Sequence, residues 1–433
     1  PISLTLTAAI HNAGPDPLPA GIGAGFAEGG RVIGEARTSA PLGPGESQTL
    51  SVIWAPEEDR TYDLSVAPLG PATEAASPAA APLCRMPGPG RFDVSVRDLR
   101  LYEGWNLVAA PVQIDDRDVR TVQRGVAGDY TAILGYEEGI APYYPDRPQD
   151  SALTAIEPGR GYWIRVTSTE PLTSTLYEEP LATWRMAGEE LAVDQDLPLA
   201  AGWNLTGYLP QASLPVGAAL QSIGGAYAAV LGFERTGVSY YPDLSAKSGY
   251  NTLLQMRGAA GYWIQATQEV TLRYPPSRGT PEWSTPTLTD TIAYRQRLDA
   301  IRLAEEAAGV RPTYTWMNLY GRIYMDDHSL APVGTTVTAM ANGLVCGATV
   351  VTNKGRFGML ACYGVDESTP EADGARIGDT ITLLLDGEPV ASLPISFNRQ
   401  GVEGGQPVLW TGHGDRWEVE VGEPYRFLLP MAM

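Results

Sequence analysis

The chain has 433 residues, more than one hydrophobic core usually serves, so several domains are expected. Its 48 glycines and 36 prolines, with only 18% charged residues, favour short strands and tight turns over long helices. The net charge of −20 argues against nucleic acid or an anionic membrane surface as a partner, because both would be repelled. The sequence lacks a signal-like segment and any apolar run near roughly 18 residues, so we expect a processed product without a transmembrane segment.

Residues 1–68 predict an Ig-like β-sandwich. Ile2, Leu4, Leu6 and Ile10 alternate with more polar residues, which is typical of a half-buried strand. The succession "IHNAGP", a Gly-Gly hairpin, "LGPGESQTLSVIW" and "TYDLSVAP" resembles the CARDB family of bacterial adhesion-related domains. That resemblance implies a seven-strand sandwich used as a spacer or adhesion module. Residues 69–91 are dense in Pro, Ala and Gly and predict a linker.

Residues 92–183 and 184–278 predict two copies of one small mixed-β domain. The blocks "EGWNLVAAPV", "GDYTAILGYE", "APYYPD" and "GRGYWIRVTS" return in the same order as "AGWNLTGYLP", "GAYAAVLGFE", "VSYYPD" and "AAGYWIQATQ". The order of elements predicted in each copy is strand, short helix, strand, turn and a final strand that carries Gly-Tyr-Trp. The "GWNL…GYW" pattern resembles a repeat of secreted and surface proteins of bacteria, a family defined by architecture rather than by chemistry.

Residues 279–316 predict a linker that contains one helix over about 289–308. Thr289 or Asp290 is suited to cap its start, and apolar residues follow at helical spacing. We expect a connector helix packed on a neighbouring sheet; the alternative is a helix presented to another subunit.

Residues 317–433 predict a second sandwich with an apolar C-terminal tail. The succession "GRIY", "APVGTTVTAMANGLVCG", "GRFGML" and "GDTITLLLDGEPV" resembles carboxypeptidase-regulatory or transthyretin-like Ig domains, which are structural companions in secreted proteins. The segment "CYGVDESTPEADGARIGDTITLLLDG" resembles a version common in the Chloroflexota phylum. Cys346 and Cys362 lie in this β-rich part and predict a disulfide in an oxidising compartment, the alternative being two buried thiols; Cys84 stands alone.

Residues suited to catalysis or metal binding do not cluster in the sequence. The histidines fall in three separate regions, and neither a nucleophile elbow nor a phosphate-binding loop is present. Neighbouring carboxylates such as Asp326 and Asp327 point in different directions, so they do not form an acid/base pair by themselves. The acidic stretches at 115–118 and 366–373 leave Ca²⁺ as the one cofactor to consider. We therefore expect a protein that is not an enzyme.

The repeated aromatic residues are the most informative candidates for a binding surface. Strand alternation places Tyr162 and Tyr262 on the expected core faces and Trp163 and Trp263 on the opposite faces, beside polar residues. These tryptophans are covered within the chain, by a neighbouring subunit or by a sugar. In the last case they would act as stacking platforms for a polysaccharide, together with Tyr143, Tyr144, Tyr240 and Tyr241.

The modules together predict a non-enzymatic, extracellular structural protein. We expect a subunit of a cell-surface filament, sheath or surface layer that assembles into a homopolymer. Strand addition by an apolar end of the chain is the expected means of assembly. The alternative is a carbohydrate-binding or adhesion module, or the non-catalytic part of a secreted hydrolase. The residues of the candidate assembly strands are Ile2, Leu4 and Leu6 at the start, and Phe427, Leu428 and Leu429 at the end.

Overall fold

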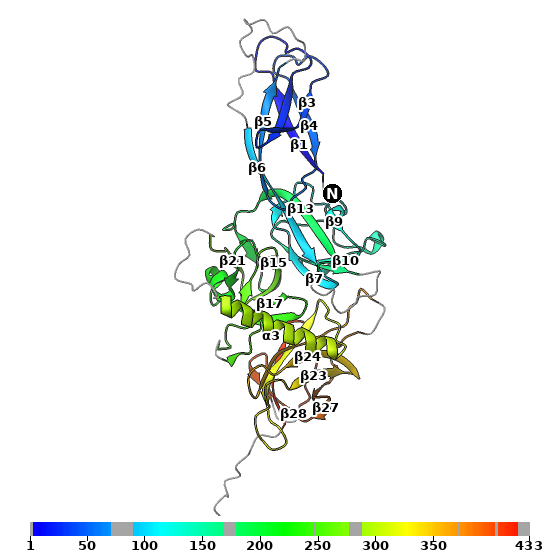
Figure 1. The fold of residues 1–433 in the computed structure, drawn as a ribbon, viewed down its shortest axis with the longest axis vertical. Coiled ribbons are helices and arrows are strands. Elements are labelled where there is room, and N and C mark those ends of the chain that lie inside the picture. Colours follow the sequence, from blue (N-terminus) through cyan, green and yellow to red (C-terminus); the bar gives the residue numbers. More distant parts are fainter. Residues whose placement is uncertain are drawn as a thin grey trace, which may run out of the picture.

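The computed structural model describes residues 3–70, 90–167, 179–245, 248–276, 288–369, 373–402 and 406–422. These residues form many small β-sheets and one long helix, so the predicted mainly β, multidomain fold with a connector helix is confirmed. Figure 1 shows the N-terminal sandwich at one end of the longest axis, the two repeats in the middle and the C-terminal sandwich at the other end. None of the helices in the described ranges combines the length and apolarity that crossing a bilayer requires.

The N-terminal sandwich packs a two-stranded sheet on a larger one. Strands β1 (Leu4–His11) and β4 (Ser47–Trp54) pair antiparallel, and alternate residues such as Leu6 point into a core with Phe26. The polar residues between them stay exposed, as period-2 alternation requires. The second sheet has the order β3 (Arg31–Arg37), β2 (Gly23–Glu28), β5 (Thr61–Leu69) and β6 (Gly90–Leu101).

Strand β6 joins the N-terminal sandwich to the first repeat. Its first half pairs with β5, and its second half pairs with β13 (Ala182–Glu190). Asp98 on β6 accepts two hydrogen bonds of 2.6 Å from Arg185 on β13. From the sequence we place the start of the first repeat at residue 92, whereas one continuous strand crosses that position. The two domains therefore share a sheet and are coupled by backbone hydrogen bonds.

Each repeat contains a four-stranded antiparallel sheet with the same strand order. The order is β11-β10-β12-β7 in the first repeat and β18-β17-β20-β15 in the second. Strands β12 and β20, which begin with Gly-Tyr-Trp, lie inside these sheets. The bounds are Gly104–Ala109 (β7), Tyr130–Tyr136 (β10), Ile140–Tyr143 (β11), Gly161–Val166 (β12), Gly202–Gly207 (β15), Tyr227–Phe233 (β17), Gly237–Tyr240 (β18) and Gly261–Ala266 (β20).

Shorter elements complete both repeats. The helices α1 (Val119–Val122) and α2 (Val216–Ala219) occur at matching places, after the first sheet strand of each copy. Asp118 caps α1 by accepting a hydrogen bond from the backbone N–H of Arg120. The remaining strands are β8 (Val112–Gln113), β9 (Val126–Ala127), β14 (Leu197–Leu199), β16 (Leu214–Pro215), β19 (Gln255–Met256) and β21 (Val270–Leu272).

The two repeats contact each other through reciprocal backbone hydrogen bonds. The N–H of Ala109 donates to the carbonyl of Ala259 at 2.9 Å, and the N–H of Gly207 donates to the carbonyl of Gly159 at 2.8 Å. Ala109 and Gly207 occupy equivalent positions in the two copies, and so do Gly159 and Ala259. In a two-fold symmetric contact, residue i of the first copy meets residue j of the second, and residue j of the first copy meets residue i of the second. The duplicated domains therefore pack as a pseudo-symmetric dimer within one chain.

Helix α3 (Leu288–Ala307) lies against the second repeat and the C-terminal sandwich (Figure 1). Its apolar residues Tyr294 and Leu298 belong to the core of the second repeat. Arg297 donates hydrogen bonds to the carbonyls of Gly249 in that repeat and Gly358 in the sandwich, at 2.7 and 3.0 Å. The helix is thus a packed connector. The side chains of Thr289 and Asp290, the predicted caps, lie outside the described residues.

The C-terminal sandwich consists of a five-stranded and a four-stranded sheet. In the larger one, β22 pairs antiparallel with β25 and parallel with β30. The larger sheet has the order β25 (Arg356–Tyr363), β22 (Trp316–Ile323), β30 (Arg416–Val421), β28 (Ser392–Phe397) and β29 (Gln400–Gly401). The smaller has the order β24 (Leu344–Val350), β23 (Thr336–Ala341), β26 (Ile381–Leu385) and β27 (Glu388–Val390).

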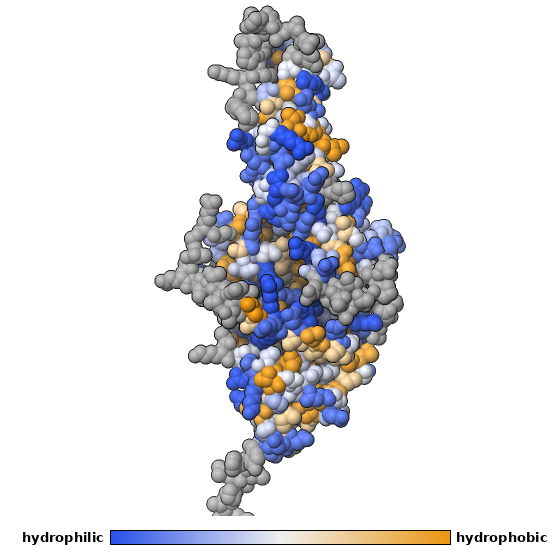
Figure 2. Space-filling model, in the orientation of Figure 1, coloured by the Kyte–Doolittle hydropathy of each residue, from blue (hydrophilic) through white to orange (hydrophobic). Residues whose placement is uncertain are grey.

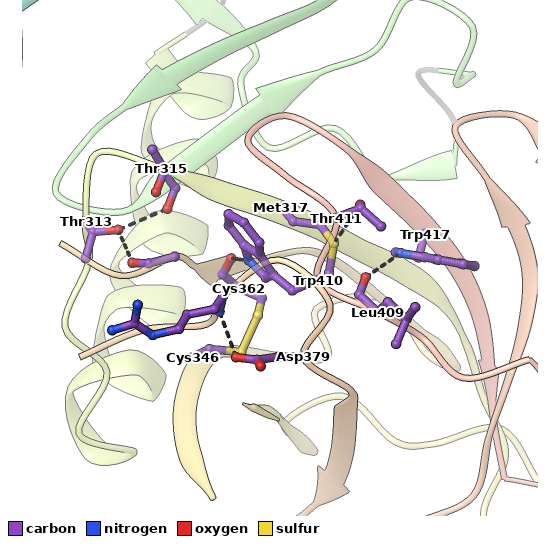
Figure 3. The surroundings of a disulfide bond; sticks show 12 residues. Thr313, Thr315, Met317, Cys346, Cys362, Asp379, Leu409, Trp410, Thr411 and Trp417 are labelled. Atoms are coloured by element: carbon purple, nitrogen blue, oxygen red, sulfur yellow. Dashed lines mark hydrogen bonds between the residues drawn. A yellow bond between two sulfur atoms is a disulfide. The ribbon is translucent and has the colours of Figure 1, made fainter. Parts of the chain in front are cut away.

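A disulfide links the two sheets of this sandwich. Cys346 on β24 and Cys362 on β25 have Cα atoms 4.7 Å apart and are bonded, which confirms the predicted pair. Figure 3 shows Trp410 beside the bond, and its indole N–H donates to the carbonyl of Cys362 at 3.0 Å. The disulfide thus lies in the core of the sandwich, between its two layers. Cys84 lies outside the described residues.

Removal of the disulfide is expected to destabilise the C-terminal sandwich. The bond closes a loop of sequence separation 16, which in the chain-entropy treatment stabilises the fold by about 3 kcal/mol. Replacement of Cys346 and Cys362 by Ala should lower the free energy of unfolding by about that amount in urea titrations. An unfolding curve that is insensitive to dithiothreitol would contradict this expectation.

Candidate functional site

The predicted aromatic candidates Trp163, Trp263, Tyr144 and Tyr241 converge where the two repeats meet the C-terminal sandwich. The outer faces of three sheets bury a shared cluster of aromatic side chains, which we call the aromatic junction. Tyrosines and small apolar residues fill the spaces between the largest rings. These largest members are Trp105, Trp163, Trp203, Phe233, Trp263, Trp316 and Tyr363, with the ring of His413 among them.

The tryptophans of the Gly-Tyr-Trp strands hold the two repeats together by reciprocal contacts. Trp163 packs edge-on against Phe233 of the second repeat, with ring centres 5.0 Å apart. Trp263 packs edge-on against Tyr136 of the first repeat, at 4.7 Å. Because Tyr136 and Phe233 are equivalent positions, the side chains obey the same pseudo-two-fold symmetry as the backbone. Edge-to-face pairs of this kind add about 0.5–1.5 kcal/mol each beyond burial.

The prediction that Trp163, Trp263 and Tyr241 act as stacking platforms for a sugar is wrong. Trp163 is 0% exposed, Trp263 2% and Tyr241 3%, so none offers a ring face to a ligand. Tyr144 is half-buried, and the guanidinium of Arg147 lies 4.0 Å from the centre of its ring. Alternation correctly separates the two faces of each Gly-Tyr-Trp strand. The face that carries tryptophan is nevertheless buried, because the other repeat and the C-terminal sandwich cover it.

Hydrogen bonds through buried polar groups join each repeat to the C-terminal sandwich. In the first repeat, the indole N–H of Trp105 donates to buried Asp366 at 2.8 Å, and Arg165 lies 3.5 Å from the same carboxylate. In the second, the side-chain amide of Asn318 donates to the hydroxyl of Tyr241 at 2.9 Å. Unpaired polar groups are costly in such an interior, so these partners fix the orientation of the domains.

A buried carboxyl group connects helix α3 to both neighbours. One oxygen of Glu305 accepts hydrogen bonds of 3.0 Å from the hydroxyls of Thr236 in the second repeat and Tyr363 in the sandwich. Burial raises the pKa of Glu305 to about 8, although both hydrogen bonds act in the opposite direction. The carboxyl is therefore mainly protonated at neutral pH, which avoids an uncompensated buried charge.

His413 lies at the centre of the junction, against three tryptophans. Its ring centre is 5.1 Å from those of Trp263 and Trp316 and 5.6 Å from that of Trp203. Nδ1 accepts the backbone N–H of Trp316 at 3.2 Å, whereas Nε2 has no hydrogen-bond partner among the described residues. Burial lowers the pKa of His413 to about 3, so its ring is neutral at physiological pH.

The described residues contain no group of three or more His, Cys, Asp and Glu side chains suited to hold a metal. The acidic stretch that suggested Ca²⁺ folds back on itself: Asp366 accepts from the hydroxyl of Ser368, and Asp373 accepts from the backbone N–H of Asp366. At the other stretch, Asp118 is used as a helix cap and pairs with Arg120. These carboxylates have structural partners in the described part of the chain.

Two clefts open on either side of the boundary between the repeats. One, of about 670 Å³, combines residues from the centre of the first repeat with the start of the second. The other, of about 420 Å³, combines the start of the first repeat with the centre of the second and with Arg302 of α3. Tyr162 lines the first cleft and Tyr262 the second, and these residues are equivalent, so the clefts are related by the same pseudo-symmetry.

Of the candidate assembly residues, the structure describes those of β1. Leu4 is half-buried and Leu6 is buried in the N-terminal sandwich. One edge of β1 pairs with β4, and no described strand pairs with its other edge. Ile2, Phe427, Leu428 and Leu429 lie outside the described residues.

Truncation of either junction tryptophan is expected to destabilise the repeats. Trp163→Ala and Trp263→Ala should each lower the free energy of unfolding by about 3–5 kcal/mol, because each leaves a cavity between the two copies. Thermal unfolding followed by circular dichroism measures the loss. Tyr144→Ala, at a half-buried ring, serves as the control and should cost about 1 kcal/mol. Native stability in either tryptophan variant would contradict the structural role.

The stability of the junction is expected to depend on pH through Glu305. The pKa of this carboxyl is raised from 4.5 to about 8, so its stabilising contribution is complete below pH 4.5 and is lost as the pH rises through 8. In Glu305→Gln this loss should be absent. The melting temperature of the variant should therefore fall less between pH 5 and pH 9 than that of the wild type, and the two decreases should differ by about 5 °C or more. An equal decrease in melting temperature in both proteins would contradict the role assigned to Glu305.

The stability that His413 contributes is expected to depend on pH in the opposite direction. Its pKa is lowered from 6.5 to about 3, so the stabilising contribution is present above pH 6.5 and is lost as the pH falls through 3. His413→Phe, which keeps a ring in the junction, should lose less stability than the wild type between pH 6.5 and 4 in the same melting experiment.

Comparison of the chain with protein-family models, with curated proteins and with solved structures finds no match.

Proposed function

We propose that the protein is a non-enzymatic structural subunit of an extracellular assembly, such as a filament, sheath or surface layer. The observation that carries this proposal is the way in which the domains are joined. Strand β6 belongs to both the N-terminal sandwich and the first repeat, and the aromatic junction fuses both repeats with the C-terminal sandwich. Large apolar interfaces of this kind suppress relative domain motion, which suits a load-bearing rod.

Two further features support an extracellular location and mechanical use. The disulfide between Cys346 and Cys362 is of the kind that persists in oxidising compartments. Helix α3 and its arginine Arg297 tie the second repeat to the sandwich in addition to the junction. A force along the long axis would therefore act on several connections in parallel.

Assembly is proposed to use the N-terminal sandwich. The outward-facing side chains Ile53 on β4 and Val32 on β3 are 74% and 61% exposed, and Figure 2 shows apolar residues on this part of the surface. The edge of β1 that no described strand occupies offers backbone groups for strand addition by a second copy. Exposed apolar side chains and an unpaired strand edge on the same domain are features that a subunit contact can use.

Self-association of the full chain tests the proposal. Light scattering after size exclusion and electron microscopy should show ordered oligomers or fibres as the concentration rises. Thr7→Lys places a charge on the exposed face of β1 and should reduce association about tenfold. Thr382→Lys is the matched control, because Thr382 is an exposed residue of β26, a strand whose two edges are both paired. A protein that remains monomeric at millimolar concentration would overturn the proposed function.

A further inference from the structure

The two layers of the N-terminal sandwich differ in width. The smaller sheet consists of β1 and β4 in the described part of the chain, whereas the larger one contributes β3, β2, β5 and β6 to this domain. Strand β4 contacts β3 and β1 contacts β2, so the smaller sheet ends at β1, before β5 and β6 of the larger sheet. The unpaired edge of β1 therefore faces the part of the sandwich in which the larger sheet extends further.

Apolar side chains on the core side of this part are left partly uncovered. Phe92 on β6 is the direct partner of Leu64 on β5, and direct partners in antiparallel strands point to the same face. Leu64 is fully buried in the core, so Phe92 also points to the core side, yet it is 36% exposed. Ala8 on β1 and Val66 on β5 point inward as well and are half-buried. We call Ala8, Val66 and Phe92 the open strip.

An additional strand beside β1 would satisfy both features of this region. Its backbone would pair with the edge of β1 that no described strand occupies. Because successive side chains of a strand point to opposite faces, every second side chain would lie over the open strip. The chemistry that fits is therefore an extended segment with large apolar residues at alternate positions.

The sequence carries such a segment after the last described strand. Residues 425–429 read Tyr-Arg-Phe-Leu-Leu and stand between two prolines. In an extended conformation Tyr425, Phe427 and Leu429 would share one face, which matches the apolar strip. Proline is tolerated at the ends of a strand and on edge strands, so the two prolines would confine pairing to these five residues.

This segment can reach the open strip only in a second copy of the chain. Figure 1 shows the N-terminal and C-terminal sandwiches at opposite ends of the long axis, with the repeats between them. Strand β30 starts at Arg416, which bonds Asp243 of the second repeat, and runs away from that repeat. Residues 423–433 span at most about 40 Å when fully extended. The C-terminal sandwich and a repeat, each about 30 Å across for roughly 100 residues, separate them from the strip.

We propose that the C-terminal segment of one copy adds as a strand to β1 of the next copy and covers the open strip. Opposite ends of the molecule meet in this contact, so it is heterologous, and repeated contacts of this kind build a filament when the rotation does not close. The contact rests on the proposed structural function, and it identifies the two surfaces that would join neighbouring subunits.

Two variants that each remove one half of the contact test it. Deletion of residues 423–433 removes the donor segment, and Phe92→Glu places a charge on the open strip. Under conditions in which the full chain associates, each variant alone should be monomeric in light scattering after size exclusion. An equimolar mixture should form one-to-one dimers, because one variant keeps the donor and the other keeps the acceptor. Wild-type association of the deleted chain, or a mixture without dimers, would overturn the contact.

A labelled peptide of residues 422–433 measures the same contact without polymerisation. In fluorescence anisotropy it should bind the deleted chain saturably, with a Kd of about 100 μM or below, and a scrambled peptide should not bind. Phe92→Glu in the deleted chain should weaken binding at least about tenfold. Ile377→Glu, at a 78% exposed residue of the C-terminal sandwich, is the matched control and should leave the affinity unchanged. Both variants should keep the melting temperature of the deleted chain.

The peptide also separates this contact from the proposed function. If the full chain associates and the peptide does not bind, the contact is wrong and the structural function stands. If the peptide binds and the full chain stays monomeric at millimolar concentration, the structural function is wrong and the binding site stands. Tighter binding of a peptide of residues 71–89, the segment that joins β5 to β6 in the sequence, would show that the C-terminal segment is the wrong occupant.

Discussion

The reciprocal burial of Trp163 and Trp263 between the two copies of the repeat is the interaction on which the structure depends. Each repeat is too small to cover both faces of its four-stranded sheet, and a sheet with one large apolar face exposed is not stable alone. The duplication solves this problem, because each copy covers the other. The remaining aromatic surface is covered by Trp316 and Tyr363 of the C-terminal sandwich, so three units form one continuous core.

A core shared by several domains makes their relative orientation part of the fold. Buried polar groups such as Asp366, Asn318 and Glu305 have partners on neighbouring units and would lose them if a domain rotated. Burial keeps Glu305 protonated and His413 neutral. The stability of the junction is therefore expected to fall at high pH through Glu305 and at low pH through His413. Rigidity across the repeats and the C-terminal sandwich therefore follows from hydrophobic contact together with the buried hydrogen bonds that cross from one unit to the next.

Comparison of the two copies of the domain shows which residues the fold constrains and which it leaves free to vary. Residues that contact the other copy are retained as aromatic or small side chains in both repeats, since any change would alter the fit of the pseudo-symmetric interface. Away from that interface the copies differ more, and the charge is reversed at two equivalent positions, Glu138 with Arg235 and Glu157 with Arg257.

The sequence by itself determined the mainly β class, the duplication, the connector helix and the disulfide between Cys346 and Cys362, because these depend on periodicity, turn residues and local spacing. It also separated the two faces of the Gly-Tyr-Trp strands. Only the tertiary structure decided that the face of Trp163 and Trp263 is buried and that β6 is shared by two domains. Alternation specifies which side chains lie together, whereas their burial depends on partners that are distant in the sequence, such as Phe233 for Trp163 and Tyr136 for Trp263, which no local pattern encodes.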